Sequence, residues 1–272
     1  MVFQFPYTVD KDQTVAKSFK AQCTPDFFLF DKNQELVYRG QMDGSRPGND
    51  ISVTGVDIRE DVVKTINQGK IHIVEPDLDG LVHHVVKEKH LKAATKPVEA
   101  DVYLIAVPTP FKDNHVPDLS YVLSATKNLI PTLKKGALVI LESTSPVGTT
   151  EKVQKLIFEE RPELKGHIHI AYCPERVLPG NVLHELKHND RAIGGINKDA
   201  TEKAIAFYKH FVVGELHATN AKTAEMVKLV ENASRDNQIA FANEQSPVLL
   251  AQDRLTDSTV MNCGCRHERS LK

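Results

Sequence analysis

The sequence has few cysteines, no long apolar run and almost no net charge, and each absence argues against a class of protein. Its 272 residues hold four cysteines at irregular spacing, Cys23, Cys173, Cys263 and Cys265, which is not the disulfide framework of a small secreted domain. No segment approaches the roughly 18 apolar residues that a membrane-spanning helix requires. With 34 basic and 36 acidic side chains and a net charge of −2, the chain as a whole favours neither nucleic acid nor an anionic membrane as a partner.

The N-terminus, MVFQFPYTVDKDQ, also lacks the basic segment and apolar stretch of a secretory leader. We therefore expect a cytoplasmic protein with free thiols. A hydrophobic content of 41% supplies a core for one large domain or two ordinary ones.

From about residue 53, short apolar runs alternate with helical patterns, which is typical of an α/β fold with a parallel sheet covered on both faces. The predicted strands are 53–58, 100–110, 136–144, 167–175 and 190–196. The predicted helices are 60–69, 77–91, 118–135, 149–161 and 199–211, followed by a long helix over 220–244. A short helix over 13–22 and a hairpin of 27–30 with 36–38 precede this region, and residues 247–272 show no clear periodicity.

The sheet lacks the glycine loop that its pattern leads one to expect. Asp57 ends the apolar run VTGV, where a dinucleotide-binding sheet holds the acid that grips the adenosine ribose. The glycine-rich phosphate loop should stand about 20 residues earlier. Only Gly40, Gly44 and Gly48 come close, at a spacing of four and not the two and three of G-x-G-x-x-G. We predict a Rossmann-like sheet without its first strand and glycine loop.

Three polar motifs follow predicted strands, at the edge where parallel sheets bind ligands. They are AVPTP at 106–110 with Thr109, ESTSPVG at 142–148 with Thr144, and YCPERVLPG at 172–180 with Glu175 and Arg176. The alternative explanations are a strand terminator, a helix N-cap and an unpaired Glu-Arg dipeptide on a surface loop, respectively.

A fourth motif lies on the long helix, where Lys228 and Asn232 are four residues apart and share one face. Such a pair is usually part of a solvated stripe.

Together these motifs, over residues 53–244, resemble the UDP-glucose/GDP-mannose dehydrogenase family, and within it the enzymes that act on UDP-N-acetyl-D-mannosamine. The resemblance implies oxidation of the C6 hydroxyl of this UDP-sugar to the uronate, with NAD as cofactor. Cys263, Cys265 and His267 have no fourth ligand at zinc-site spacing, so we predict no metal site. The resemblance implies that three residues bind NAD, namely Asp57, Thr109 and Thr144. It implies that the catalytic residues are Thr144, Glu175, Lys228 and Asn232, and that the substrate is bound by Arg176, Lys228 and Asn232. It also implies a homodimer through the helix over 218–246.

Two motifs of the family have no counterpart in this sequence, one before the matching region and one after it. The family's cysteine nucleophile belongs to a G-G-x-C motif beyond the central helix, and residues 247–272 contain no such motif. Without it and without the glycine loop, we predict impaired or lost activity. Residues 1–54 resemble the C-terminal half of a thioredoxin-like AhpC/TSA protein without its C-x-x-C. The predicted divisions are 1–52, 53–217, 218–246 and 247–272.

Two other functions stay open. One is a non-catalytic remnant that binds a nucleotide or nucleotide sugar. The other is a redox protein that acts through the thioredoxin-like fragment.

Overall fold

The computed structural model describes residues 27–30, 36–40, 52–73, 78–113, 116–177 and 182–251, of which 27–30, 36–40 and 245–251 are described by their backbone alone. The chain divides into two compact units, Met1–Val53 and Thr54–Lys272. In the first, β1 (Phe27–Phe30) pairs antiparallel with β2 (Leu36–Gly40), which confirms the predicted hairpin. The helix predicted over 13–22, and Cys23, lie outside the described residues.

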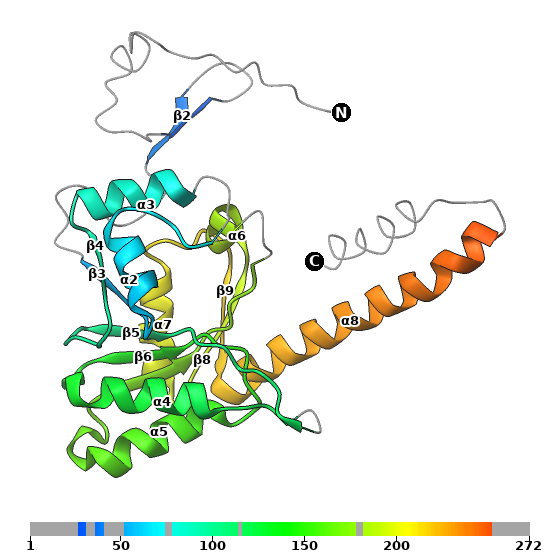
Figure 1. Cartoon of the computed structure of the whole chain (residues 1–272). Helices are drawn as coiled ribbons and strands as arrows, with labels where there is room; N and C mark the ends of the chain where they lie inside the picture. The colour runs from blue at the N-terminus through cyan, green and yellow to red at the C-terminus, as the bar shows by residue number, and fades with distance from the viewer. Residues whose placement is uncertain are drawn as a thin grey trace, which may run out of the picture. The chain divides into compact units, whose positions relative to one another are not determined.

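The second unit is built on a five-stranded sheet (Figure 1). In spatial order its strands are β5 (Val102–Ile105), β6 (Leu138–Leu141), β7 (His169–Tyr172), β8 (Arg191–Gly195) and β9 (Leu216–Asn220). The first three are parallel to one another, and β8 is parallel to β9. The predicted α/β sheet is thus confirmed, with one antiparallel junction between β7 and β8. The sequence did not reveal this junction, because a strand buried on both faces has the same apolar pattern in either direction.

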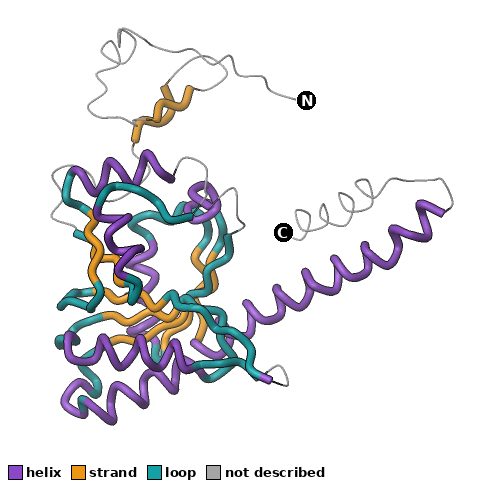
Figure 2. Tube along the Cα trace, viewed as in Figure 1, coloured by secondary structure: helices purple, strands orange, loops and turns teal. Residues whose placement is uncertain are grey.

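Helices cover both faces of this sheet. In β6, Val139 and Leu141 pack into the core beneath α4 (Ser120–Leu129) and α5 (Thr149–Glu160). The alternate residues Leu138 and Ile140 pack on the other face, with Tyr208 of α7 (Lys198–Tyr208). All four residues of β6 are buried, as expected when alternate side chains enter two apolar layers. Figure 2 shows the helices and strands in these layers. Two 3₁₀ turns, Ile130–Thr132 and Pro162–Leu164, follow α4 and α5.

A separate two-stranded sheet precedes this one. It is formed by β3 (Val53–Val56) and β4 (Leu91–Ala94), with α2 (Glu60–Asn67) and α3 (Leu78–Lys87) between them in sequence. Asn67 fastens the segment, because its side chain donates to the Ala93 carbonyl at 2.9 Å and accepts from the Ala93 amide at 2.7 Å.

Within the described residues, the sheet is split where a Rossmann sheet has its first strand. A Rossmann sheet has the order 3-2-1-4-5-6, so its first strand lies between the second and the fourth. Here β3 and β5 correspond to those neighbours, and in the described part of the chain they belong to different sheets. Val53, Val56 and Leu104 on these strands are 51%, 46% and 46% exposed. Side chains that a complete sheet would bury therefore remain in contact with solvent.

Three short elements were missed by sequence reasoning: β4, α6 (Val182–His188) and β9. Each has four to seven residues, which is too short to show a period clearly. Because β9 ends at Asn220, it runs across the predicted boundary at 217/218.

The long helix α8 (Ala221–Ala251) has 31 residues and runs outward from the five-stranded sheet (Figure 1). It confirms the predicted long helix. It also continues to Ala251, so the first residues of the predicted irregular tail are helical. None of the described helices combines the length and apolar composition that crossing a membrane would require.

Candidate active site

The ends of β5 and β6 bring together Thr109 and Thr144. The backbone amide of Ser143 donates to the Ile105 carbonyl at 3.3 Å, which holds the turn after β6 against the end of β5. The Thr109 hydroxyl donates to the Thr144 carbonyl at 2.6 Å. Both threonines are half-buried. The two segments predicted to line a cofactor site therefore meet at one edge of the sheet.

A buried carboxylate from α8 closes the turn between β6 and α5. Glu225 is fully buried and accepts from the backbone amides of Gly148 and Thr150, the latter at 2.8 Å, and from the Thr150 hydroxyl at 2.7 Å. A helix N-terminus attracts anions because its first amides lack partners and its dipole is positive. At α5 this place is taken by a side chain of the protein itself.

The start of α5 tests the N-cap explanation of the ESTSPVG motif. The helix begins after Gly148, whose φ is 91°, and no side chain of the motif caps it. The N-cap explanation is therefore wrong. Sequence reasoning missed Glu225; the only signal was that Ala221 and Ala224 beside it are small residues that permit close packing.

The loop after β7 is fastened to the second turn of α8. The Lys228 ammonium donates to the Glu175 carbonyl at 2.6 Å. The carboxylate of Glu175 accepts from the Val177 amide. Lys228 is half-buried, and burial lowers its pKa against the opposing effects of Glu175 and Glu231. A cationic donor in partly dry surroundings thus stands against this loop.

Arg176 is held by two partners. One terminal nitrogen donates to the Asp190 carbonyl at 2.7 Å, and the other forms an ion pair with Glu231 of α8 at 2.5 Å. The alternative of an unpaired Glu-Arg dipeptide is therefore wrong for the arginine, whose partner is Glu231 of α8 and not the adjacent Glu175. Asn232 lies one turn beyond Lys228, and its side chain is exposed.

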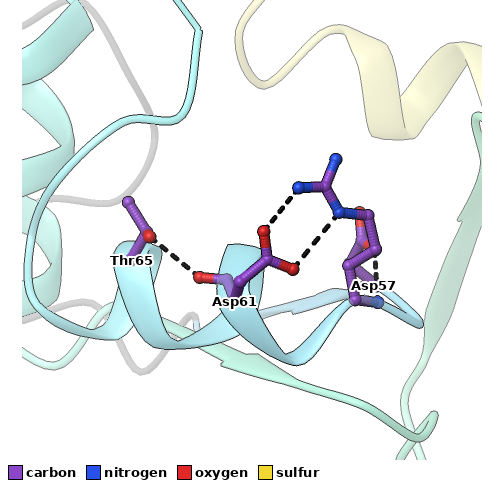
Figure 3. A network of polar contacts seen from close by, with 4 residues as sticks. Asp57, Asp61 and Thr65 are labelled. Carbon is purple, nitrogen blue, oxygen red and sulfur yellow. Dashed lines mark hydrogen bonds and ion pairs between the residues drawn. The ribbon is translucent and has the colours of Figure 1, made fainter.

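Asp57 is not brought to these residues. Its amide donates to the Ala94 carbonyl at 3.2 Å, and its carboxylate accepts from the Arg59 amide at 2.8 Å. Arg59 in turn pairs with Asp61, whose carbonyl accepts from Thr65 (Figure 3). These contacts all lie within the β3–β4 segment, on the far side of the split from β5.

The described residues fit NAD only in part. A carboxylate at a strand end can accept from ribose hydroxyls, as Asp57 could. Thr109 and Thr144 lie after β5 and β6, at the edge of the sheet where ligands bind in this architecture. No described residues supply a glycine turn for the pyrophosphate, and the N-terminus of α5 is already filled by Glu225.

Comparison with known proteins places the chain in one family. The model of the UDP-glucose/GDP-mannose dehydrogenase family, NAD binding domain, matches residues 45–212. A UDP-N-acetyl-D-mannosamine dehydrogenase of Campylobacter jejuni is 58% identical over 205 residues, which cover 72% of this chain and 50% of the relative. An NDP-N-acetyl-D-galactosaminuronic acid dehydrogenase of Ralstonia nicotianae is 54% identical over 204 residues, which cover 72% and 48%. The chain spans about half the length of these relatives.

Among solved structures, a UDP-D-ManNAc dehydrogenase from Pyrococcus horikoshii superposes with a TM-score of 0.72 at 38% identity, covering 82% of this chain and 54% of that one. The family match begins at residue 45, before the boundary predicted at 53. These relatives give no support to the thioredoxin-like resemblance of residues 1–54. The match over more than half of the sequence shows that the chain belongs to the UDP-glucose/GDP-mannose dehydrogenase family.

Proposed function

We propose that the chain takes part in the NAD-dependent oxidation of the C6 hydroxyl of UDP-N-acetyl-D-mannosamine to the uronate. The observation that carries this proposal is the contact between Lys228 and the loop of Glu175, at the same sheet edge as Thr109 and Thr144. The change from hydroxyl to carboxylate removes two hydrides and takes up the oxygen of one water, so two NAD molecules, bound in turn, would each accept one hydride. The remaining chemistry requires a cation beside the C6 oxygen and a group that handles its proton.

Lys228 suits the first requirement. An ammonium has three donors, and one of them is used by the Glu175 carbonyl. The other two remain for a substrate oxygen, so Lys228 could stabilise an alkoxide forming at C6 while it stays attached to the loop. Thr144 and Glu175 would border the reacting carbon, and Asn232 would support Lys228 from the next turn.

In this scheme Arg176 holds the loop after β7 in place and could also bind an anionic group of the substrate. Its two terminal nitrogens are engaged by Asp190 and Glu231. An anionic substrate would reach the guanidinium by displacing the Glu231 carboxylate, which would leave the bond to Asp190 in place.

The test is binding and turnover by the full chain. Isothermal titration with UDP-N-acetyl-D-mannosamine measures affinity, and absorbance after addition of NAD measures NADH. We expect the wild type to bind, and Lys228→Ala to weaken binding about tenfold or more, since a hydrogen bond to a charged group contributes about 1.5–3 kcal/mol. Lys152→Ala, an exposed lysine on α5, is the matched control.

The outcomes separate the functions. Binding with NADH formation supports the enzyme, and binding without NADH supports the non-catalytic remnant. No binding, or equal losses in both lysine variants, overturns the proposal. UDP-N-acetyl-D-galactosamine is the comparison substrate, because a relative at 54% identity is named for the galacto sugar.

We also propose that the functional unit is a homodimer formed through α8. Met226, Val230 and Phe241 on this helix are 49%, 57% and 66% exposed. Positions 226, 230 and 241 recur at helical spacing, so they form one apolar stripe. A shallow groove of about 510 Å³ includes Met226 and Val230 of this stripe, and its other lining residues are Val147, Lys222, Thr223, Val227 and Glu231. A second copy of the same helix would cover these side chains.

Light scattering after size exclusion tests the dimer. We expect a dimer for the wild type, a monomer for Val230→Glu, and a dimer for Val213→Glu, which changes a valine outside α8 that is more exposed than Val230. A monomeric wild type refutes the dimer.

A further inference from the structure

Beneath the candidate site lies a cluster of polar side chains from four elements. The Tyr208 hydroxyl of α7 donates to the carboxylate of Glu142, the residue after β6. The Arg191 guanidinium of β8 lies 5.0 Å from the centre of the Tyr208 ring. The same guanidinium approaches the Cys173 sulfur, after β7, at 3.9 Å. Arg191, Tyr208 and Cys173 are 3%, 1% and 0% exposed.

Packing alone does not explain this cluster, because burying charged and polar side chains costs free energy. A buried charge is tolerated when partners compensate it. One terminal nitrogen of Arg191 donates to the Leu186 carbonyl at 3.1 Å, but within the described residues its Nε has no partner. Glu142 supplies the opposite charge nearby. An apolar core would fill the same volume without these groups, so the cluster invites a functional explanation.

The backbone of Glu142 connects the cluster to the site. Its amide donates to the Ile105 carbonyl at 2.9 Å, and its carbonyl lies 3.5 Å from the Glu175 amide, a long contact. Thr144 follows two residues later. A shift of the Glu142 side chain would therefore move the ends of three strands, those of β5, β6 and β7.

We propose that Glu142 is a positioning residue of the candidate site, anchored by Tyr208 and Arg191, and that its protonation state is transmitted to Thr144 and Glu175. Its importance for catalysis rests on the proposed function. The coupling itself does not, because it is carried by contacts within the chain.

The groups around Glu142 set the sign of the expected effect. Burial raises the pKa of Glu142, while the hydrogen bond from Tyr208 and the charge of Arg191 lower it, and Glu175 raises it. Burial raises the pKa of Cys173 to about 11 and raises that of Tyr208 as well. Both therefore stay protonated near neutral pH, and Glu142 is the member of the cluster that changes charge in acid.

The experiment follows the backbone amide resonances of Thr144 and Glu175 in the isotope-labelled full chain from about pH 4 to about pH 8, the range where a carboxyl with a raised pKa titrates. In the wild type we expect both amides to report one shared transition above the ordinary glutamate range. Glu142→Gln should abolish it. Tyr208→Phe should move it to higher pH, because the ionised carboxylate loses a donor.

Glu202→Gln is the matched control, since Glu202 is an exposed glutamate on the same helix as Tyr208. It should leave the transition unchanged. If Glu142→Gln does not fold, the direction of the shift in Tyr208→Phe decides. A transition that survives Glu142→Gln, or that Tyr208→Phe leaves unmoved, overturns the proposal.

The two proposals fail separately. If UDP-N-acetyl-D-mannosamine does not bind but the shared transition is found, the proposed function fails and the coupling stands. If the sugar nucleotide binds and the pH transition of the Thr144 and Glu175 amides is unchanged in Glu142→Gln, the coupling is refuted and the proposed function stands.

Discussion

Replacing Glu225 with glutamine should destabilise the five-stranded unit by about 3 kcal/mol. The carboxylate has two oxygens that both accept, from the Gly148 amide on one side and from the Thr150 amide and hydroxyl on the other. A glutamine can accept on one side only, and its NH₂ group then faces a backbone N–H. The variant keeps the size of the side chain, so it removes the charge and one acceptor without opening a cavity.

The magnitude follows from those contacts. A hydrogen bond to a charged group contributes about 1.5–3 kcal/mol, and a buried donor left without a partner costs about 1–3 kcal/mol. The negative charge at the N-terminus of α5 contributes about 0.3–1 kcal/mol more. These effects overlap, because the lost bond and the unpaired amide belong to the same site, and about 3 kcal/mol is the combined expectation.

Urea unfolding followed by circular dichroism measures the loss, and amide hydrogen exchange at Gly148 and Thr150 locates it. Glu151→Gln is the control, since this first-turn acid of α5 is exposed and should change stability by less than about 0.5 kcal/mol. If Glu225→Gln unfolds at the wild-type urea concentration and its two amides stay protected, the carboxylate does not cap α5 as argued.

Three other substitutions test the site, the core and the split sheet. Arg176→Lys cannot span both Asp190 and the Glu231 ion pair, so hydrogen exchange of the loop after β7 should accelerate while that of β6 is unchanged. Burial raises the pKa of the Cys173 thiol from the ordinary 9.0 to about 11. Above pH 9.0 the unfolded chain therefore loses the thiol proton before the folded chain does, and the free energy of unfolding should fall as pH rises. Urea unfolding should show a smaller fall for Cys173→Ala. Leu104→Thr should change the unfolding free energy by less than about 0.5 kcal/mol, since Leu104 is exposed at the split; a loss of about 2 kcal/mol or more, the range for a buried leucine, would mean that this strand edge is covered.

The elements predicted correctly are those with a clear apolar run or a clear helical period in the sequence. β5, β6 and β7 are apolar runs bounded by turns, and α8 is a long helical pattern, so all of them were found. β9, with the sequence LHATN, has no run of that kind, and its place in the sheet comes from pairing with β8. The antiparallel direction of β8 relative to β7 likewise depends on how the chain connects the two strands, so the sequence of β8 does not reveal it.

The site divides in the same way. Thr109, Thr144 and Glu175 were predicted to share an edge because each follows a strand, and the structure brings their segments together. Glu225, Glu231 and Glu142 were not predicted. In the sequence they are ordinary acidic residues of a helix or a turn. Their roles arise from partners far along the chain: Gly148 is 77 residues from Glu225, Tyr208 is 66 residues from Glu142, and Glu231 pairs with Arg176.

Helix α8 explains why the loops of the site keep their arrangement although the sheet is split. Glu225, Lys228 and Glu231 are three residues apart, so they lie on neighbouring positions of one side of the helix. Glu225 contacts the start of α5, whereas Lys228 and Glu231 contact the loop after β7, at the carbonyl of Glu175 and the guanidinium of Arg176. The helix therefore fixes the loops after β6 and β7 relative to each other through contacts that do not involve β3 or β4. Asp57 makes no such contact with α8 among its described contacts, so the split between β3 and β5 should disturb the ribose end of a cofactor site more than the Lys228 end.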